Sequence, residues 1–143
     1  MGIYICETDE QIAACEPVMH ELRPHVLPEA FVQRVRKQEE GGYRLVCCND
    51  GQKPVAAAGF RVSLNLAWGR FLYVDDLVTL DAERSRGYGA ALLKWLRDYA
   101  RQQNCDELHL DSGVQRKAAH RFYDREGMDM TSYHYTTRLG GGS

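Results

Sequence analysis

The sequence predicts a mixed α/β fold. Apolar residues recur at helical spacing after Thr8 and after Pro28, as they do in amphipathic helices. Near-continuous apolar runs, which are typical of buried strands, occupy residues 43–48, 54–62 and 71–80. A chain of 143 residues, 44% hydrophobic and 27% charged, is large enough to bury a normal core. These observations predict one globular domain in which strands and helices alternate.

The domain is expected to open with a short strand at residues 3–6, followed by a helix. Thr8 and Gln11 have the spacing of a capping box, in which each side chain binds the other residue's backbone N–H at a helix start. Pro17 is expected to kink this helix, because proline lacks the N–H that a helix interior uses.

A second helix and a hairpin should follow. Pro28 suits the first turn of a helix, and Gly41 with Gly42 suits its end. The Asn-Asp-Gly stretch at residues 49–51 separates two apolar runs, which is typical of a tight turn between antiparallel strands.

The second half of the chain continues the same alternation. The elements expected are a strand at residues 71–80, a helix at 86–103, a strand at 107–111, a short helix at 118–128 and a final strand at 131–139. The Gly-Gly-Gly-Ser stretch at residues 140–143 resembles a flexible linker, so we expect the domain to span residues 1–139.

The turn after strand 71–80 has the composition of a phosphate-binding site. It reads Arg84-Ser85-Arg86-Gly87-Tyr88-Gly89-Ala90. Unpaired N–H groups at a helix start favour a bound anion, and Gly87 and Gly89 let the backbone approach it without a Cβ in the way. The guanidinium groups of Arg84 and Arg86 add donors that suit phosphate oxygens.

Spacing excludes two better-known phosphate loops. A Walker-type loop needs Gly-x-x-x-x-Gly-Lys followed by Ser or Thr, and the dinucleotide fingerprint needs three glycines where this turn has two. The remaining pattern, Arg-x-x-Gly-x-Gly, resembles the central motif of the GCN5-related N-acetyltransferases (GNAT). The resemblance covers residues 71–128 and ends with Phe122-Tyr123 and Gly127-Met128, which is similar to the family's Phe-Tyr-x-x-x-Gly-Phe element.

The resemblance implies a GNAT-like fold: a mixed, mostly antiparallel central sheet flanked by helices, with a V-shaped splay between the two central strands. It also implies that acetyl-CoA is the acetyl donor. The turn at 84–90 would hold its pyrophosphate, and backbone groups of the preceding strand would hold its pantetheine arm. The implied cofactor-binding residues are Leu77, Val78, Thr79, Arg84, Ser85, Arg86, Gly87, Tyr88, Gly89 and Ala90.

Two residues are candidates for catalysis. Tyr123 occupies the position of the family's catalytic tyrosine and would donate a hydrogen bond or proton to the departing thiolate. The alternative is an ordinary core tyrosine.

Asp75 and Asp76 interrupt an apolar strand. Adjacent strand residues point to opposite faces of a sheet unless a β-bulge redirects one of them, and the family has such a bulge at this strand. Asp76 is the preferred candidate for orienting or deprotonating an amine, and the alternative is an exposed acidic pair on the sheet rim.

These features predict transfer of an acetyl group from acetyl-CoA to a primary amine of a small molecule by direct attack. A lysine-type amine has a pKa near ~10.4, so roughly one in a few thousand is neutral at pH 7 and a base is needed. An N–H near Leu77 could stabilise the oxyanion. The alternatives are a non-catalytic acyl-CoA-binding or sensing module and a generic phosphate- or nucleotide-binding domain.

The acceptor itself stays open among polyamines, aminoalkylphosphonates, antibiotics and protein amines. Asp75 and Asp76 favour a cationic amine. Residues 8–40 are expected to shape the acceptor side of the cleft, although no single residue there can be chosen.

Composition narrows the other partners. A net charge of −2 gives no general attraction to nucleic acid or membranes, and no apolar run approaches the ~20 residues that cross a bilayer. Five cysteines form no C-x-x-C pair and are expected to be free thiols, and five histidines show no metal spacing, so no metal is predicted. The absence of a leader favours a cytoplasmic location, and a homodimer is left open.

Overall fold

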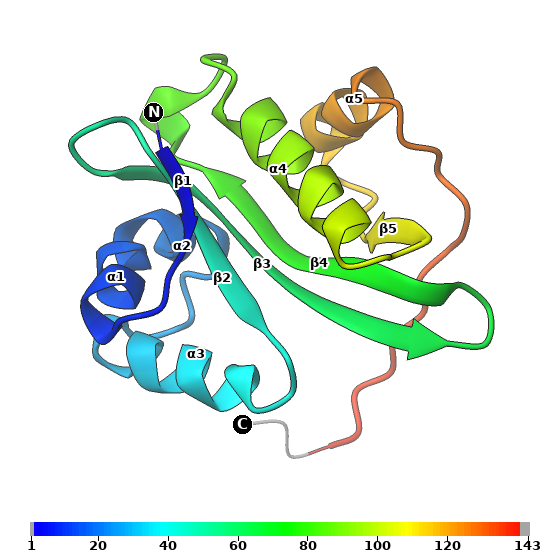
Figure 1. Ribbon diagram of the computed structural model, residues 1–143, viewed down its shortest axis with the longest axis horizontal. Helices are drawn as coiled ribbons and strands as arrows, with labels where there is room; N and C mark the ends of the chain where they lie inside the picture. The colour runs from blue at the N-terminus through cyan, green and yellow to red at the C-terminus, as the bar shows by residue number, and fades with distance from the viewer. Residues whose placement is uncertain (1, 141–143) are drawn as a thin grey trace. The chain divides into compact units, whose positions relative to one another are not determined.

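The computed structural model describes residues 2–140, and the chain divides into two compact units, Met1–Leu110 and Asp111–Ser143. The first unit contains a five-stranded sheet with helices on both faces, and the second contains one helix (Figure 1). The elements in chain order are β1 (Gly2–Ile5), α1 (Asp9–Ala14), α2 (Glu16–Leu22), the 3₁₀ turn η1 (Pro28–Ala30), α3 (Phe31–Glu39), β2 (Arg44–Asn49), β3 (Pro54–Asn65), β4 (Gly69–Thr79), the 3₁₀ turn η2 (Asp81–Glu83), α4 (Tyr88–Gln102), β5 (Glu107–Leu110) and α5 (Lys117–Arg125).

The sheet confirms the predicted mixed, mostly antiparallel architecture. Its strand order is β1-β2-β3-β4-β5, and only the β4–β5 pair is parallel. That pair runs from Phe71, opposite Glu107, to Val74, opposite Leu110. Beyond Val74, β4 continues to Thr79 with a strand partner on its β3 side alone among the described residues. This one-sided edge is the V-shaped opening that the sequence predicts.

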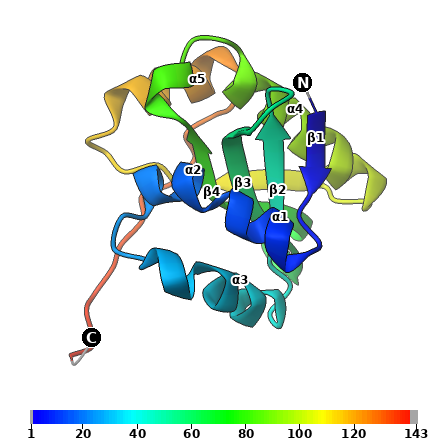
Figure 2. The same cartoon turned by 90° about the vertical axis from the view of Figure 1, so that its left-hand side faces the viewer.

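Both faces of the sheet are buried, each by a different set of helices. Leu45 and Cys47 of β2 join the core cluster that contains the buried side chains of α1, α2 and α3. Val46 and Cys48 face the other way and join the cluster built on α4. Figure 2 shows α1, α2 and α3 on one face of the sheet and α4 on the other. A strand buried on both faces explains why β2 reads as a continuous apolar run and not as an alternating one.

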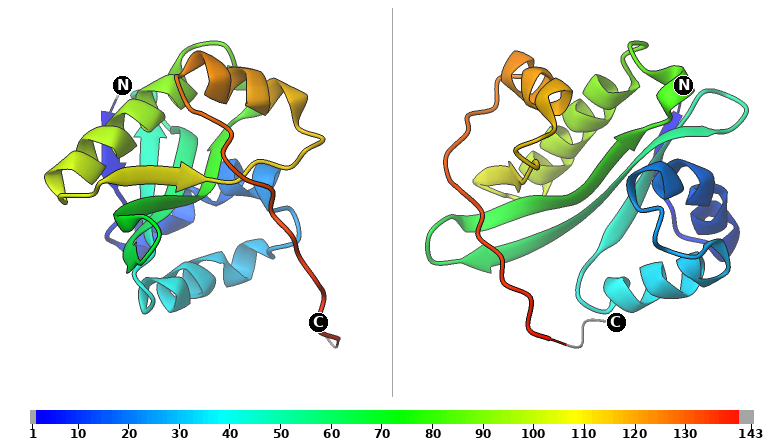
Figure 3. Two further views of the ribbon diagram at one scale, coloured as in Figure 1. Left: turned by 90° about the vertical axis from the view of Figure 1, so that its right-hand side faces the viewer. Right: turned by 180° about the vertical axis from the view of Figure 1, so that it is seen from behind.

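β3 and β4 form a long hairpin that extends past the end of β2 (Figure 3). β2 pairs with β3 only as far as Phe60, whereas β3 and β4 stay paired as far as Asn65 and Gly69. The hairpin therefore carries β3 and β4 beyond their neighbour β2.

Local signals placed most helix ends correctly. Thr8 and Gln11 form the predicted capping box, with the Gln11 N–H donating to the Thr8 hydroxyl at 3.1 Å. Pro17 does not kink a single long helix. The helix is interrupted at Cys15, which separates α1 from α2, and Pro17 lies in the first turn of α2. That position suits proline, since N–H groups in a first turn have no helical partner.

The second unit departs from one prediction. Residues 131–139 form no strand, and every one of their side chains is exposed. A strand needs a hydrogen-bonded neighbour and a buried face, and the segment has neither within the described residues. The predicted short helix is confirmed as α5, which ends before Gly127 at φ +81°. Residues 141–143 of the predicted linker lie outside the described residues.

Two general features complete the fold. All five cysteines are free thiols, as predicted, and all but Cys105 are buried. Across residues 2–140, no helix has the length and apolar character that a membrane span requires.

Candidate active site

A β-bulge in β4 shapes the centre of the candidate site. Gly59 on β3 pairs with Asp76, but the next residue, Phe60, pairs with Val74, so Asp75 is the extra residue of the bulge. A bulge bends its strand and re-aims the side chains beside it. The bulge predicted at the two aspartates is therefore present.

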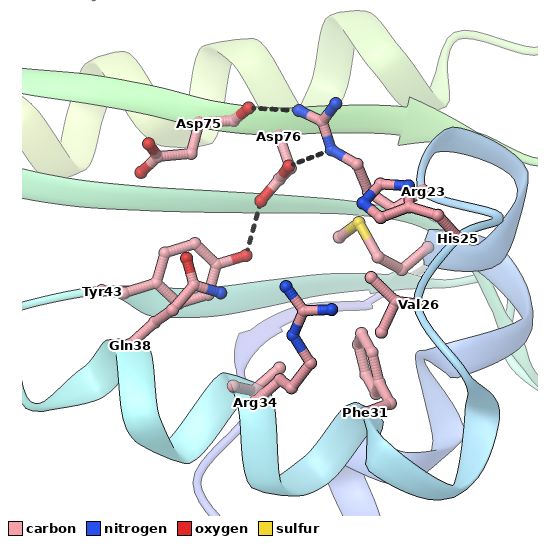
Figure 4. Close-up of a pocket in the computed structure, with 11 residues that line it drawn as sticks. Arg23, His25, Val26, Phe31, Arg34, Gln38, Tyr43, Asp75 and Asp76 are labelled. Atoms are coloured by element: carbon pink, nitrogen blue, oxygen red, sulfur yellow. Dashed lines mark hydrogen bonds and ion pairs between the residues drawn. The ribbon is translucent and has the colours of Figure 1, made fainter. Parts of the chain in front are cut away.

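Asp76 binds two partners from distant parts of the chain (Figure 4). Its Oδ1 accepts a hydrogen bond from the Arg23 Nε at 2.9 Å, and its Oδ2 accepts one from the Tyr43 hydroxyl at 2.8 Å. Arg23 also donates to the backbone carbonyl of Asp75 at 3.1 Å. Burial and the adjacent Asp76 carboxylate raise the pKa of Tyr43 well above its usual value. Tyr43 is therefore a protonated donor that fixes the direction of the carboxylate.

Gly59 makes room for this arrangement. A Cβ on Gly59 would overlap the hydroxyl and the ring of Tyr43. The Tyr43 ring is buried, so it would have to shift from its packed position to admit that atom. Only glycine at residue 59 lets the phenol cross the sheet directly beneath Asp76.

Asp75 forms an ion pair with a second arginine. Its Oδ2 lies 2.9 Å from the Nε of Arg61 on β3. Burial raises the pKa of Asp75, and the Arg61 guanidinium opposes that shift without cancelling it. Both carboxylates of the bulge are thus paired with an arginine, and neither is the exposed rim acid of the alternative interpretation.

A pocket of about 270 Å³ opens beside the bulge. Most of its wall comes from residues 8–40, the region expected to shape the acceptor side. The lining residues are Met19, Arg23, His25, Val26, Phe31, Arg34, Val35, Gln38, Tyr43, Asp75 and Asp76. Figure 4 shows Asp76 and Tyr43 on one side of this space and Arg34, projecting from α3, on the other.

The part of β4 that lies beyond its pairing with β5 offers free backbone groups. Leu80 donates its N–H to Val55 on β3 at 2.8 Å. Because amide directions alternate along a strand, Val78 also faces β3, while Leu77 and Thr79 direct their N–H and C=O groups to the open edge. Of the three residues predicted to hold a pantetheine arm, two therefore have suitably directed backbone groups.

The turn at residues 84–90 has the geometry of an anion cradle. Gly87 is the N-cap of α4, with φ 85° and ψ 5°, and no side chain caps the helix start. The first N–H groups of an α-helix have no partner within the helix, so those of Tyr88, Gly89 and Ala90 are available to a ligand. Ser85 also adopts a left-handed conformation, with φ 67°.

The two arginines of the cradle are held by weak surface pairs. Arg84 lies 3.2 Å from Asp81, and Arg86 lies 3.4 Å from Glu83. Both guanidinium groups are about two-thirds exposed, and exposed pairs of this kind contribute only about 0–1 kcal/mol. A phosphate could therefore recruit either arginine at little cost. The cradle residues thus fit a pyrophosphate.

Tyr123 lies on α5 in the second unit. Its ring packs edge-on against Phe122, with centroids 5.4 Å apart. Burial raises the pKa of Tyr123, so the phenol is protonated at neutral pH and can act as a donor.

Sequence patterns did not identify three residues that the structure brings to the site. Arg23 follows the end of α2, Arg34 lies on α3 and Tyr43 precedes β2, and none belongs to a local motif, so their meeting depends on the folded sheet. Among residues 2–140, no group of histidine, cysteine or acidic side chains is arranged to hold a metal ion.

Comparison with known proteins identifies the family. The model of the acetyltransferase (GNAT) family matches residues 6–128. An uncharacterized N-acetyltransferase of Bacillus subtilis, YhdJ, is 36% identical over 126 residues, covering 87% of this chain and 89% of that protein. An aminoalkylphosphonate N-acetyltransferase of Salmonella typhimurium is 35% identical over 66 residues, covering 46% of this chain and 43% of that protein.

The fold agrees with this assignment. A putative acetyltransferase from Agrobacterium tumefaciens superimposes with a TM-score of 0.82 at 23% identity, covering 97% of this chain and 100% of that one. The family match spans both the bulged strand and the cradle. The chain therefore belongs to the GNAT family and is an acetyl-CoA-dependent acyltransferase.

Proposed function

We propose that this protein transfers the acetyl group of acetyl-CoA to the primary amine of a small molecule, by direct attack of the amine on the thioester. One observation carries the proposal. The open edge of β4 runs from a carboxylate-lined pocket at Asp76 to η2, which leads into the cradle at the start of α4. One strand thus leads from the pocket that would hold the acceptor to the turn that would hold the pyrophosphate.

The donor would lie along this strand. The N–H groups at the start of α4, with Arg84 and Arg86, would hold the pyrophosphate. The backbone groups of Leu77 and Thr79 would hold the pantetheine arm. These contacts would place the thioester beside the bulge, where the Leu77 N–H can stabilise the oxyanion that forms during attack.

The acceptor would enter from the α2–α3 side of the sheet. Asp76, fixed by Tyr43 and Arg23, would orient the ammonium group or accept its proton, directly or through water. After attack, the thiolate needs a hydrogen-bond donor, and we assign that role to Tyr123.

Residues 1–139 would act as one catalytic domain. It would work in the cytoplasm, because free cysteines such as those of this chain persist in a reducing compartment.

A small acceptor suits the pocket. Ligand pockets commonly measure about 300–1,000 Å³, and the pocket here, at about 270 Å³, lies just below that range. The name of the Salmonella relative also states a small-molecule amine as its substrate. Both observations support a compact amine over a large antibiotic.

The test is a panel of primary amines incubated with acetyl-CoA and the protein while free thiol is measured. We expect thiol release that depends on both the amine and the protein, with the acetylated amine found by mass spectrometry. A silent acyl-CoA-binding module would give a different result: acetyl-CoA would raise the melting temperature, because it binds the native state, but no amine would release thiol.

A further inference from the structure

The charges on the pocket wall favour a type of acceptor that the acidic strand alone does not suggest. The pocket is lined by two aspartates, two arginines and a histidine. Asp76 already binds Arg23, and Asp75 already binds Arg61. Each acid therefore has a guanidinium partner before any substrate arrives, and the pocket presents no uncompensated negative charge.

Arg34 lines the pocket and, among the described residues, has no ion-pair partner. Among residues 2–140, no side chain forms a hydrogen bond or an ion pair with its guanidinium group. The other basic residues of α3 differ in this respect: Arg36 pairs with Asp9 and Glu39, and Lys37 pairs with Glu40. Arg34 thus gives the pocket a net positive charge at its α3 end.

The helix directs Arg34 into the pocket. Phe31, Arg34, Val35 and Gln38 follow the i, i+3, i+4, i+7 pattern of a single helix face, and all four line the pocket. Phe31 and Val35 are buried and anchor this face to the core. Figure 4 shows the Arg34 guanidinium reaching into the space opposite Asp76 and Tyr43, with His25 and Gln38 also on the wall.

We propose that the acceptor amine carries an anionic group, a carboxylate or a phosphonate, which binds Arg34 at the α3 end of the pocket. This inference rests on the proposed acetyl transfer. The amine lies at the other end, beside Asp76, because the Leu77 N–H that would stabilise the oxyanion belongs to the next residue of β4. Arginine suits the anion, since its planar fork of donors matches carboxylate and phosphonate oxygens.

The same geometry disfavours a polyamine. Its second ammonium group would reach the α3 end and face Arg34, and the described residues that line the pocket include no acid without an arginine partner. Like charges in such a site disfavour binding, which is a common source of specificity. The expectation of a simple cationic acceptor, based on Asp75 and Asp76 alone, did not account for the two arginines that pair with them.

The first experiment compares amines that differ in the anionic group. β-Alanine is paired with β-alaninamide, and 2-aminoethylphosphonate with ethanolamine. In each pair we expect the anionic compound to have the higher kcat/KM, by at least about tenfold, as for a contact with a charged partner. The two pairs also distinguish a carboxylate from a phosphonate as the preferred anion.

The second experiment changes the arginine. Arg34→Gln should raise KM for the anionic amines by about tenfold to a hundredfold and leave the constants of their neutral counterparts nearly unchanged. Arg34→Lys should restore part of the loss, because it keeps the charge but not the fork. Lys37→Gln is the matched control: it removes a positive charge from the same helix at an exposed residue outside the pocket, and should leave every constant unchanged.

Two results would overturn the inference, and they are distinguishable. Equal or faster turnover of the neutral or cationic amines, unaffected by Arg34→Gln, would remove the anion site and leave acetyl transfer intact. A protein that releases thiol with none of these amines, nor with a wider amine panel, would remove the proposed function and the anion site together.

Discussion

Asp76 lies beside the bulged residue of β4, lines the pocket and belongs to the part of β4 that has no pairing with β5. Its two oxygens bind different partners, Arg23 and Tyr43, so the carboxylate cannot rotate without breaking a hydrogen bond. A fixed carboxylate can direct an amine to one trajectory, and this is how positioning contributes to catalysis. The Arg23 guanidinium pairs with one carboxylate oxygen, and the Tyr43 hydroxyl sets the direction of the other.

Replacing this carboxylate tests its role directly. Asp76→Asn keeps the shape but loses the charge, and we expect kcat/KM for every active amine to fall by about a hundredfold or more, the range for a general base. The thermal shift produced by acetyl-CoA should persist, because the cradle is untouched. Asp98→Asn, at an exposed acid of α4 that pairs with Lys94 and Arg101, is the control. Unchanged kinetics in the Asp76 variant would remove both of its proposed roles.

Tyr123 is tested by a comparison of rate with affinity. A phenol of pKa near ~10 is a weaker acid than a thiol near ~8.5, so full proton transfer to the thiolate is uphill by roughly 2 kcal/mol. Burial raises the pKa of Tyr123 further, which favours a hydrogen-bonding role as charge builds on sulfur.

We therefore expect Tyr123→Phe to lower kcat by an amount in or just below the range of about a hundredfold to ten-thousandfold. The affinity for acetyl-CoA should be retained, because the ring remains. Steady-state rates and cofactor affinity are measured on the same variant. An unchanged kcat would make Tyr123 a packing residue, and a loss of affinity alone would make it a binding contact.

At the scale of elements, β3 and the residue that precedes β2, Tyr43, support the bulge through a close approach at Gly59. Gly59→Ala would push a methyl group into the buried ring of Tyr43. Overpacking of this kind destabilises a protein by about 1–3 kcal/mol, and the variant should also lose activity because Asp76 loses its phenol. Gly41→Ala is a matched control, since its Cβ would have only ordinary contacts, the nearest at 3.6 Å. Urea unfolding that gave both variants the same stability would contradict this packing.

The start of α4 is tested with the donor itself. Acetyl-CoA should raise the melting temperature of the unaltered protein, and Gly89→Val should abolish that rise by placing a branched side chain against the phosphates. Arg84→Ala should weaken binding less, because the backbone donors remain. Gln102→Val introduces the same side chain near the other end of α4 and should keep the full shift. A full shift in Gly89→Val would place the pyrophosphate elsewhere.

The elements also show which features a sequence can predict. The capping box at Thr8, the turn at residues 49–51 and the glycine-bearing start of α4 are specified by neighbouring residues, and all three are confirmed. The strand expected at residues 131–139 is wrong, because strand formation depends on a partner that local composition does not reveal.

At the scale of the whole molecule, the pocket beside the bulge was beyond local prediction for the same reason. Arg23 lies 53 residues from its partner Asp76, and Tyr43 lies 33 residues from it. The sequence identified the two acids but not Arg23 and Arg61, which pair with them, so the charge balance of the pocket could not be read from it. Electrostatic character is a property of the assembled sheet and helices, and it appears only when the tertiary contacts are known.

The buried phenol of Tyr43 gives this assembly a measurable pH dependence. Its folded pKa is raised well above the usual value by burial and by Asp76, whereas in the unfolded chain a tyrosine ionises near pH ~10. Above that pH the folded state holds a proton that the unfolded state releases, so the free energy of unfolding falls as pH rises. The contribution is fully present well below pH ~10 and decreases as pH rises through that value, with a slope that approaches about 1.4 kcal/mol per pH unit until the folded pKa is reached.

Tyr43→Phe removes this proton together with the hydrogen bond to Asp76. At pH 8 the unaltered protein should therefore be the more stable of the two, by about 1.5–3 kcal/mol for a hydrogen bond to a charged group. Between pH 10 and pH 11 this advantage should shrink by about 1 kcal/mol, because the tyrosine of the unfolded chain is already half ionised at pH 10 and only the unaltered protein has the buried phenol. Urea unfolding in a reducing buffer measures the difference in the free energy of unfolding between the two proteins, and contributions that both share cancel in this difference.

Tyr133→Phe, at an exposed tyrosine, is the control. A difference that stays constant across this range would mean that Tyr43 ionises in the folded protein as readily as in the unfolded chain, and it would then not be the fixed donor that orients Asp76.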